Sequence, residues 1–395
     1  MNNMKILVSG ASVAGITLAY WLNENGFEVT IVEKSSEIRG GGYPIDVRGS
    51  AINITKKMGI YELLKSKSLD NMQIKFLDSK NNIVGQFTDN AMKEHDDIEI
   101  PRGELTNALF EKISSKNIEI LYSDSIKTIN EEDNGINIEL ESGRKEVFDL
   151  VIGADGIHSN TRKLVFGSEH NFTKYLGYNF TGFSMENELN MYKEGRIYSE
   201  SGKTSVMYAT KDENFIHAFL VFYEPDETRV DHRDVETQRA IVKEKFSTLE
   251  GITPRMLESL NKSNSIYFDT TTQIIMDTWS NGRVALVGDA AHAPSFLTGQ
   301  GSSLAMIGAY VLANELKLNN NINDAFESYE RTMKPFVELN QNVIGKDSFS
   351  IVAPKNNEEL EKRNVILEQM SDKAEEEVGA NDVVDITRVI DYPGL

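Results

Sequence analysis

The sequence predicts an α/β protein in which a parallel-sheet domain is interrupted by a β-sheet domain and followed by a helical section. Three observations support this fold class. The chain opens with a strand, a glycine turn, a helix and a second strand, which together form the βαβ unit of a parallel sheet. The middle of the chain is mainly of β type, and a strand, glycine turns and a helix recur after it. The first domain is therefore expected to be discontinuous along the chain.

The elements of the first part follow from hydrophobic periodicity and from the positions of glycine. In order, they are a strand at Lys5 to Ser9, a helix at Ile16 to Asn25, a strand at Glu28 to Glu33, a helix at Ser50 to Met58, strands at Ile74 to Leu77 and Ile83 to Phe87, a helix at Glu104 to Ile113, and strands at Ile118 to Tyr122, Ile136 to Leu140 and Leu150 to Ile152. The two short strands after residue 73 indicate an excursion out of the first domain, which then resumes in α/β alternation.

The middle of the chain is predicted to form an antiparallel sheet with one polar helix, after which the chain returns to the first domain. The elements expected there are strands at Tyr178 to Met185, Thr204 to Thr210 and Phe215 to Tyr223, a helix at Asp234 to Thr248, a strand at Arg283 to Val287 and a helix at Ser302 to Leu316. Helices follow, with Pro335 and Pro354 as breaks. We expect the first domain over residues 1–72, 99–175 and 270–318, the second over 73–98 and 176–269, and C-terminal helices over 319–395.

The composition excludes several classes of function. Lys and Arg total 41 against 61 Asp and Glu, so the net charge of −20 repels nucleic acid and anionic lipid surfaces. There is no cysteine, and the six histidines show no metal-ligand spacing, so no metal site is expected. No apolar run approaches the ~18 residues of a membrane span. A cytoplasmic location is the default expectation, a small molecule is the expected partner, and the oligomeric state stays open.

The first motif that could carry chemistry is the turn Gly10-Ala11-Ser12-Val13-Ala14-Gly15, which follows a strand and opens a helix. Glu33 ends the next strand. This is the context of a dinucleotide site: glycine allows the tight turn, helix amides meet a pyrophosphate, and the carboxylate meets a ribose. Serine replaces the middle glycine, and its side chain is expected to crowd the pyrophosphate. A turn without a ligand is the alternative, but Glu33 favours nucleotide binding.

The second motif runs from Asp149 to Ser159. A buried strand delivers Asp155 and Gly156 to a turn, where an acid and a free backbone could meet a ribose or a pyrophosphate. The alternative is an Asp-Gly turn that simply ends a core strand.

The third motif, Gly282 to Pro294, is the most specific. Asp289 lies at a strand end, where its carboxylate can accept hydrogen bonds from a polyol. Gly299-Gln300-Gly301 then leads into a helix whose amino end faces the same place. A reduced flavin there would have its negative charge favoured by the helix dipole.

The three motifs, in this order and spacing, resemble the single-component FAD-dependent aromatic hydroxylases, the class A flavoprotein monooxygenases. The resemblance covers the chain up to about Gln341 and implies a Rossmann-type FAD-binding domain interrupted by a β-sheet substrate domain. It also implies NADH or NADPH as electron donor, with Glu33 on the adenosine ribose, Asp289 on the ribityl chain and Arg102 on the flavin side. The cofactor-binding residues expected in total are Gly10, Ser12, Ala14, Gly15, Glu33, Lys34, Arg48, Arg102, Asp155, Asp289, Pro294, Gly299, Gly301 and Ser302. No catalytic acid or base is expected, because the flavin carries the chemistry.

Within that family the chain looks most like the tetracycline-inactivating flavin monooxygenases. The supporting segments are Gly41 to Ser50, Glu99 to Arg102, Gly195 to Ile197, Ile216 to Phe219 and Ser328 to Glu330. The resemblance places Arg196 and His217 at ligand-holding positions, where they could bind a keto-enolate; a surface arginine and a core histidine are the alternative. The other expected substrate residues, which line an apolar pocket or form the domain core, are Phe183, Met207, Tyr208 and Phe219.

The expected reaction is hydroxylation of an aromatic or polycyclic keto-enol substrate with NAD(P)H and O2, with tetracycline-like compounds as leading candidates. A flavin-dependent halogenase is disfavoured, because Trp21 and Trp279 are the only tryptophans and the Trp-x-Trp-x-x-Pro segment is missing. Two rival functions stay open. One is that of a flavin oxidase or reductase without oxygen insertion, and the second is that of a ligand-sequestering protein with a degenerate flavin site.

Overall fold

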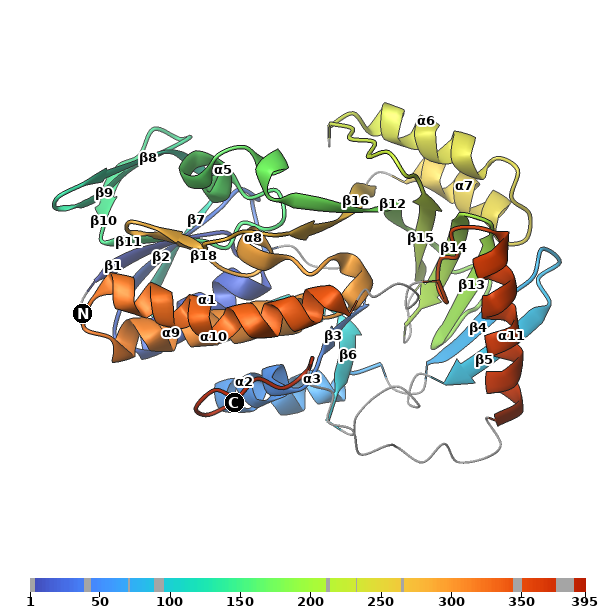
Figure 1. Cartoon of the computed structure of the whole chain (residues 1–395), viewed down its shortest axis with the longest axis horizontal. Coiled ribbons are helices and arrows are strands. Elements are labelled where there is room, and N and C mark those ends of the chain that lie inside the picture. The colour runs from blue at the N-terminus through green and yellow to red at the C-terminus, as the bar shows by residue number, and fades with distance from the viewer. Residues whose placement is uncertain are drawn as a thin grey trace.

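The computed structural model describes residues 4–38, 44–69, 72–88, 96–210, 214–231, 233–263, 266–343, 350–373 and 387–395. Two lobes lie side by side along the longest axis (Figure 1). The first is an α/β lobe on the left that holds both chain ends, and the second is built on a large sheet at the right. In the described part of the chain, no helix has the length and apolar character needed to cross a bilayer.

The first lobe is organised around a six-stranded sheet with the order β17-β18-β11-β1-β2-β7. Its strands are β1 (Lys5–Ser9), β2 (Glu28–Glu33), β7 (Ile118–Tyr122), β11 (Leu150–Gly153), β17 (Ser280–Asn281) and β18 (Val284–Leu286). All neighbours are parallel except β17 and β18. The apolar runs in these strands are buried because a parallel sheet is covered on both faces.

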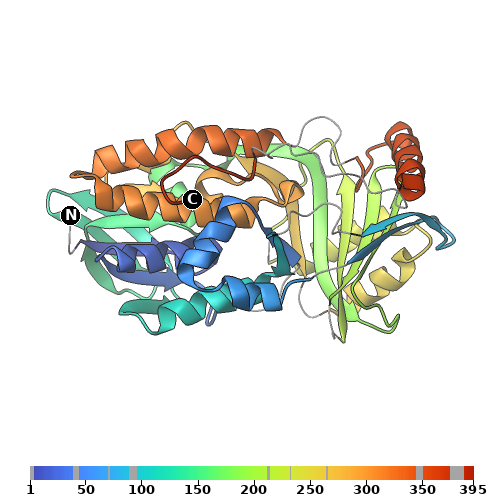
Figure 2. The same ribbon diagram turned by 90° about the horizontal axis from the view of Figure 1, so that it is seen from below.

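Helices cover one face of this sheet and a small sheet covers the other. Ile6 and Val8 pack toward the helices, whereas Leu7 packs toward the small sheet, because alternate residues of a strand point to opposite faces. The helices of the lobe are α1 (Val13–Glu24), α2 (Ser50–Met58), α3 (Tyr61–Ser66), α4 (Arg102–Ser114), α5 (Asn160–Phe166), α8 (Asp289–His292), α9 (Gly301–Leu318) and α10 (Ile322–Asn342). The small antiparallel sheet consists of β8 (Ile126–Glu132), β9 (Gly135–Leu140) and β10 (Lys145–Phe148). Figure 2 shows α9 and α10 running side by side along the lobe.

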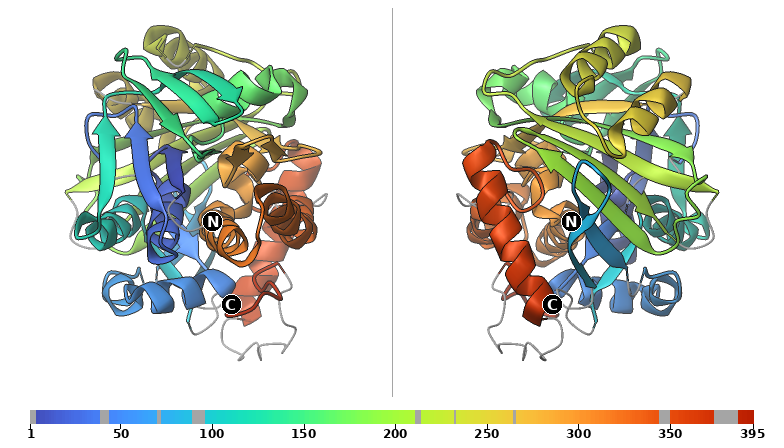
Figure 3. Two further views of the ribbon diagram at one scale, coloured as in Figure 1. Left: turned by 90° about the vertical axis from the view of Figure 1, so that its left-hand side faces the viewer. Right: turned by 90° about the vertical axis from the view of Figure 1, so that its right-hand side faces the viewer.

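The second lobe is a seven-stranded sheet with the order β16-β12-β15-β14-β13-β4-β5. Its strands are β4 (Gln73–Leu77), β5 (Ile83–Thr88), β12 (Thr173–Glu186), β13 (Glu194–Glu200), β14 (Lys203–Ala209), β15 (Phe215–Tyr223) and β16 (Tyr267–Ile274). Helices α6 (Val235–Phe246) and α7 (Thr253–Lys262) cover one face, and α11 (Asn357–Lys373) packs against β5 and β13 (Figure 3). The part of the sheet near β12 and β16 is turned toward the first lobe.

Smaller elements join the two lobes. The strands β3 (Pro44–Val47) and β6 (Ile98–Pro101) pair antiparallel between them, and short 3-10 helices form at Glu169–Asn171 and Phe296–Thr298. The last residues of the chain return to the first lobe, where Ile390 and Tyr392 join its hydrophobic core.

The predicted fold class is confirmed, and four details of the expected elements were wrong. The second sheet is not purely antiparallel, because β13 and β4 pair in parallel. The strand β13 and the helix α7 were not predicted. The strands β8, β9 and β10, between residues 126 and 148, form a separate antiparallel sheet instead of continuing the α/β alternation. Pro335 lies inside α10 and does not end it. The helix tolerates the missing N–H because neighbours such as Met333 and Val337 are buried in the core. The domain boundaries stay a prediction.

Candidate functional site

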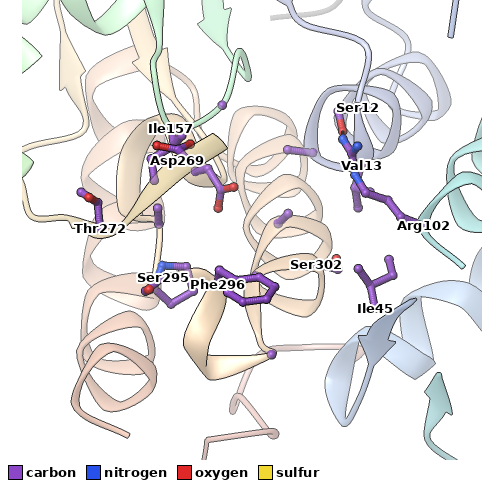
Figure 4. A pocket seen from close by; sticks show the side chains of 18 of the residues that line it. Ser12, Val13, Ile45, Arg102, Ile157, Asp269, Thr272, Ser295, Phe296 and Ser302 are labelled. Carbon is purple, nitrogen blue, oxygen red and sulfur yellow. Dashed lines mark hydrogen bonds between the residues drawn. The ribbon is translucent and has the colours of Figure 1, made fainter. Parts of the chain in front are cut away.

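A cavity of about 240 Å³ lies where the two lobes meet (Figure 4). A buried water needs only ~15 Å³ of such space, so the cavity has room for an organic ring system. The first lobe contributes the starts of α1 and α9, and the second contributes residues of β12 and β16. Of the expected cofactor-binding residues, the cavity is lined by Ser12, Ala14, Arg102, Asp289, Pro294, Gly299, Gly301 and Ser302.

The glycine turn between β1 and α1 is packed too tightly for side chains at two positions. A Cβ on Gly15 would lie 1.9 Å from the carbonyl oxygen of Gly10, and one on Gly10, whose φ is 106°, would lie 2.6 Å from that of Ala154. Glu33 accepts hydrogen bonds from the backbone N–H of Ala11 at 2.8 Å and of Ser35 at 2.9 Å. The carboxylate predicted to meet a ribose therefore also holds the turn in place.

Ser12 and Arg102 meet at one side of the cavity (Figure 4). Ser12 is the N-cap residue of α1, but its hydroxyl makes no capping hydrogen bond within the described structure. Instead, Nη2 of Arg102 donates a hydrogen bond to Oγ of Ser12 at 2.9 Å. Arg102 is the first residue of α4 and reaches this position from the β6 side of the site.

Asp289 follows β18 and faces the open cavity. The start of α9 lies beside it, since a Cβ on Gly301 would be 4.0 Å from Oδ1 of Asp289. The side chain is exposed to the cavity. Desolvation by the surrounding cavity walls raises the pKa of its carboxyl to about 6, while the positive charge of Arg102 acts in the opposite direction. The third motif thus places the Asp289 carboxylate, a hydrogen-bond acceptor, and the amino end of α9 at the same cavity.

Asp155 does not reach the cavity as expected. Oδ2 of its carboxylate accepts hydrogen bonds from the backbone N–H and the hydroxyl of Thr161, each at 2.8 Å, and Oδ1 accepts one from the hydroxyl of Ser159. The Asp155 carboxylate therefore stabilises its own turn and the start of α5. Its neighbours Ala154 and Gly156 line the cavity, whereas Asp155 itself does not. The contact of this acid with a ribose or a pyrophosphate stays a prediction.

Arg48 and Lys34 also lie away from the cavity wall. Arg48 forms an ion pair with Asp46 at 2.9 Å, and its backbone N–H donates to the hydroxyl of Ser303 at 3.0 Å. Asp46, rather than Arg48, lines the cavity. Lys34 is exposed directly after Glu33. Of the Gly41 to Ser50 segment that supported the resemblance, residues 41–43 lie outside the described residues.

Three expected substrate residues share the sheet face that is turned toward the first lobe. Tyr208 is paired with His217, and Phe219 lies two residues further along β15 on the same face. The ring of Phe219 lies 6.2 Å from that of Phe296, which stacks on Phe180 with 4.8 Å between the ring centres. Phe180 and Phe296 line the cavity. Neither residue was predicted, because only the folded chain brings the 3-10 helix at 296–298 against β12.

The other three expected substrate residues lie on the opposite face. Met207 is fully buried and Phe183 is 6% exposed, both in the core beneath α6 and α7. Arg196 is paired with Met207, and its Nε donates to Oε1 of Glu194 at 2.7 Å. Since adjacent residues of a strand point to opposite faces, Arg196 and His217 cannot hold one ligand between them. That expectation was wrong.

A charged network that sequence analysis did not predict joins the lobes next to the cavity. His158 lies 3.2 Å from both Glu169 and Asp269, and its pKa is raised to about 10 by the hydrogen bonds to Asp269 and then Glu169. Arg162 is fully buried and donates to the carbonyl of Ala290 at 3.0 Å, next to Asp289 in sequence. This network could not be predicted from the sequence, because Asp269 is 111 residues from His158 in the chain.

The arrangement fits a flavin dinucleotide. Two helix amino ends, those of α1 and α9, open into one cavity, where their N–H groups favour electron-rich or negatively charged parts of a ligand. Arg102 adds a positive charge, and Asp289 adds an acceptor for hydroxyl groups. Among the described residues, no group of three or more His, Asp or Glu could hold a metal ion.

Comparisons with known proteins agree with this geometry. A family model described as an FAD binding domain matches residues 3–342. A relative named flavin-dependent monooxygenase, from an unknown prokaryotic organism, is 36% identical and covers 94% of this chain and 96% of its own length. The crystal structure of tetracycline destructase Tet(51) has a TM-score of 0.82 at 34% identity, with 94% of this chain and 96% of that chain covered. Tetracycline destructase Tet(55) has a TM-score of 0.82 at 36% identity, with 95% and 98% covered.

Proposed function

The chain belongs to the FAD-binding family of flavin-dependent monooxygenases, and on that premise we propose that it hydroxylates a polycyclic keto-enol substrate of the tetracycline type with NAD(P)H as electron donor. The similarity to two tetracycline destructases supports the substrate class.

The observation that carries the proposal is the composition of the two cavity walls. One wall holds Asp289 and the start of α9, and the other holds the aromatic rings of Phe180, Tyr267 and Phe296. Flat aromatic surfaces suit a planar multi-ring substrate, which can bury apolar area against them. A substrate that packs against the aromatic wall would have its rings next to the cofactor-binding lobe.

Bound FAD would supply electron transfer from NAD(P)H and the activation of O2. The residues of this chain would hold and orient the reactants. Asp289 would accept hydrogen bonds from the ribityl hydroxyls, and the first turn of α9, at Gly301 and Ser302, would donate N–H groups to the electron-rich edge of the ring. The aromatic wall would keep water from the space between ring and substrate, which suppresses wasteful release of reduced oxygen.

The test is an assay of NADH and NADPH consumption with a tetracycline and with simple phenols, in which product mass is measured under isotopically labelled O2. A tetracycline product that carries one labelled oxygen atom is expected. Peroxide release without a labelled product from any substrate would favour a flavin oxidase or reductase. A purified protein that stays colourless and takes up no added FAD would favour a sequestering protein.

A further inference from the structure

Ser12, in the dinucleotide turn, is an N-cap residue whose hydroxyl does not cap its helix. Serine is among the preferred N-cap residues because its hydroxyl accepts from an N–H group of the first helical turn. Ser159 does this at the start of α5, accepting from the backbone N–H of Arg162 at 2.9 Å. Ser12, the N-cap of α1, makes no such bond within the described structure. Its side chain therefore does not block the N–H groups of the first turn of α1.

The hydroxyl of Ser12 is directed to Arg102 instead, at 2.9 Å from Nη2. The two residues are 90 positions apart, so the contact joins the glycine turn to the start of α4. Within the described part of the chain, Ser12 is the one side chain that hydrogen-bonds the Arg102 guanidinium. Both residues line the cavity. A long, half-buried arginine has many rotamers, and a fixed partner reduces the entropy that it loses when a ligand binds.

We propose that Ser12 is a positioning residue for Arg102. Its hydroxyl anchors the guanidinium beside the start of α1, so that the free N–H groups of the helix and the positive charge together face the negatively charged part of bound FAD. This inference rests on the FAD-binding part of the proposed function and does not depend on the substrate.

The proposal reverses the expectation that follows from the glycine pattern alone. If a side chain at this position only crowded the pyrophosphate, Ser12→Gly would strengthen FAD binding. If Ser12 anchors Arg102, both Ser12→Gly and Ser12→Ala weaken FAD binding, because a hydrogen bond to a charged group is lost. Such a bond corresponds to about a tenfold rise in Kd.

The experiment measures the Kd of FAD by diluting purified holoprotein and following the fluorescence of released FAD. Ser12→Ala and Ser12→Gly should each raise Kd about tenfold, whereas Ser12→Thr, which keeps a hydroxyl, should stay within about threefold of the native protein. Unchanged or tighter binding in Ser12→Gly, or a Thr variant as weak as the Ala variant, would overturn the proposal.

A double-mutant cycle with Arg102→Ala separates positioning from general damage to the turn. In the Arg102→Ala background, Ser12→Ala should have almost no further effect on Kd, because the guanidinium that it anchors is missing. A further loss as large as in the native background would show that Ser12 acts without Arg102, contrary to the proposal. The thermal unfolding midpoint should be the same for Ser12→Ala and native protein after FAD release. All readouts follow FAD alone, so a wrong substrate assignment would leave them unaffected.

Discussion

The two walls of the cavity differ in how their chemistry is encoded. On the first lobe, each functional group belongs to a local unit of strand, turn and helix, as with Asp289 between β18 and α9. On the second lobe, a side chain reaches the cavity only if the pleat of its strand turns it to the correct face. His217 faces the first lobe, and Arg196 on a nearby strand does not. The groups on the first lobe can thus be found from local motifs, whereas the side chains that the second lobe turns toward the first depend on strand register.

The largest expected effect on stability and FAD binding lies in the glycine turn of the first lobe. Gly15→Ala places a Cβ 1.9 Å from a backbone oxygen that cannot move without breaking the turn. We expect the unfolding free energy to fall by about 3 kcal/mol or more, and FAD retention to be lost. Gly301→Ala is the matched control, since its nearest contact would be at 4.0 Å and the fold should survive. Urea unfolding of both variants checks this, and equal stability of the two would contradict the tight packing.

The acid stability of the first lobe should depend on His292. This side chain is 1% exposed, its ring centre lies 4.7 Å from that of Trp279, and burial lowers its pKa to about 4. Between pH 6.5 and 4 the unfolded chain binds a proton that the folded chain does not. The stability present above pH 6.5 is therefore lost as the pH falls through this window, by on the order of 3 kcal/mol.

In the variant His292→Gln, the unfolded chain no longer binds this extra proton, because glutamine does not titrate. The unfolding free energy of this variant, measured by urea titration at several pH values, should fall less steeply between pH 6.5 and 4 than that of the native protein. His217, on β15 of the second lobe, is half-buried and serves as a control in the variant His217→Gln. Identical slopes for native protein and His292→Gln would show that the buried imidazole does not govern acid stability.

Asp289→Ala should lower the affinity for FAD about tenfold or more, because a ribityl hydroxyl loses a charged acceptor. The matched variant is Asp155→Asn, whose carboxylate is bonded to its own turn. That variant should lower the unfolding free energy while FAD binding in the folded protein changes little. The ratio of flavin to protein after purification reports FAD binding, and thermal unfolding reports stability, so the two measurements together distinguish the two variants. Full flavin retention by Asp289→Ala would refute the assignment.

The smallest effect is expected on the sheet of the second lobe. His217→Ala should raise the KM for a turned-over tetracycline about fivefold, the size of one modest hydrogen bond. Arg196→Ala should leave KM unchanged, because Arg196 faces the other side of the sheet beside Glu194. Steady-state kinetics of both variants tests the difference. If Arg196→Ala raised KM and His217→Ala did not, the faces assigned here would be irrelevant to substrate binding.

The same contrast explains how much of the structure could be predicted from the sequence. The βαβ unit, the Asp289 turn and α9 were predictable, because periodicity and glycine positions act over a few neighbouring residues. The parallel pairing of β13 with β4 was not, since it joins segments over 100 residues apart. Pro335 looked like a helix end because its local effect is real, and burial of neighbouring side chains in the core overrides it.

Within the site, the departures also have physical causes. Asp155 does not line the cavity, although it ends a strand, because an aspartate in a turn first satisfies nearby N–H and hydroxyl groups. The ring stack of Phe180 and Phe296 depends on the contact between lobes and left no local pattern. The hydrogen bond between Ser12 and Arg102 spans 90 residues, so the sequence could show only that a glycine was missing.

The most direct test of the flavin site is a crystal structure of the protein with FAD. We expect the isoalloxazine ring in the cavity between Asp289 and the aromatic wall, with its pyrimidine edge within hydrogen-bond distance of the N–H groups at the start of α9. The ribityl chain should lie against the carboxylate of Asp289. A ring bound outside the cavity, or a pyrimidine edge turned away from α9, would contradict the assignment of the site.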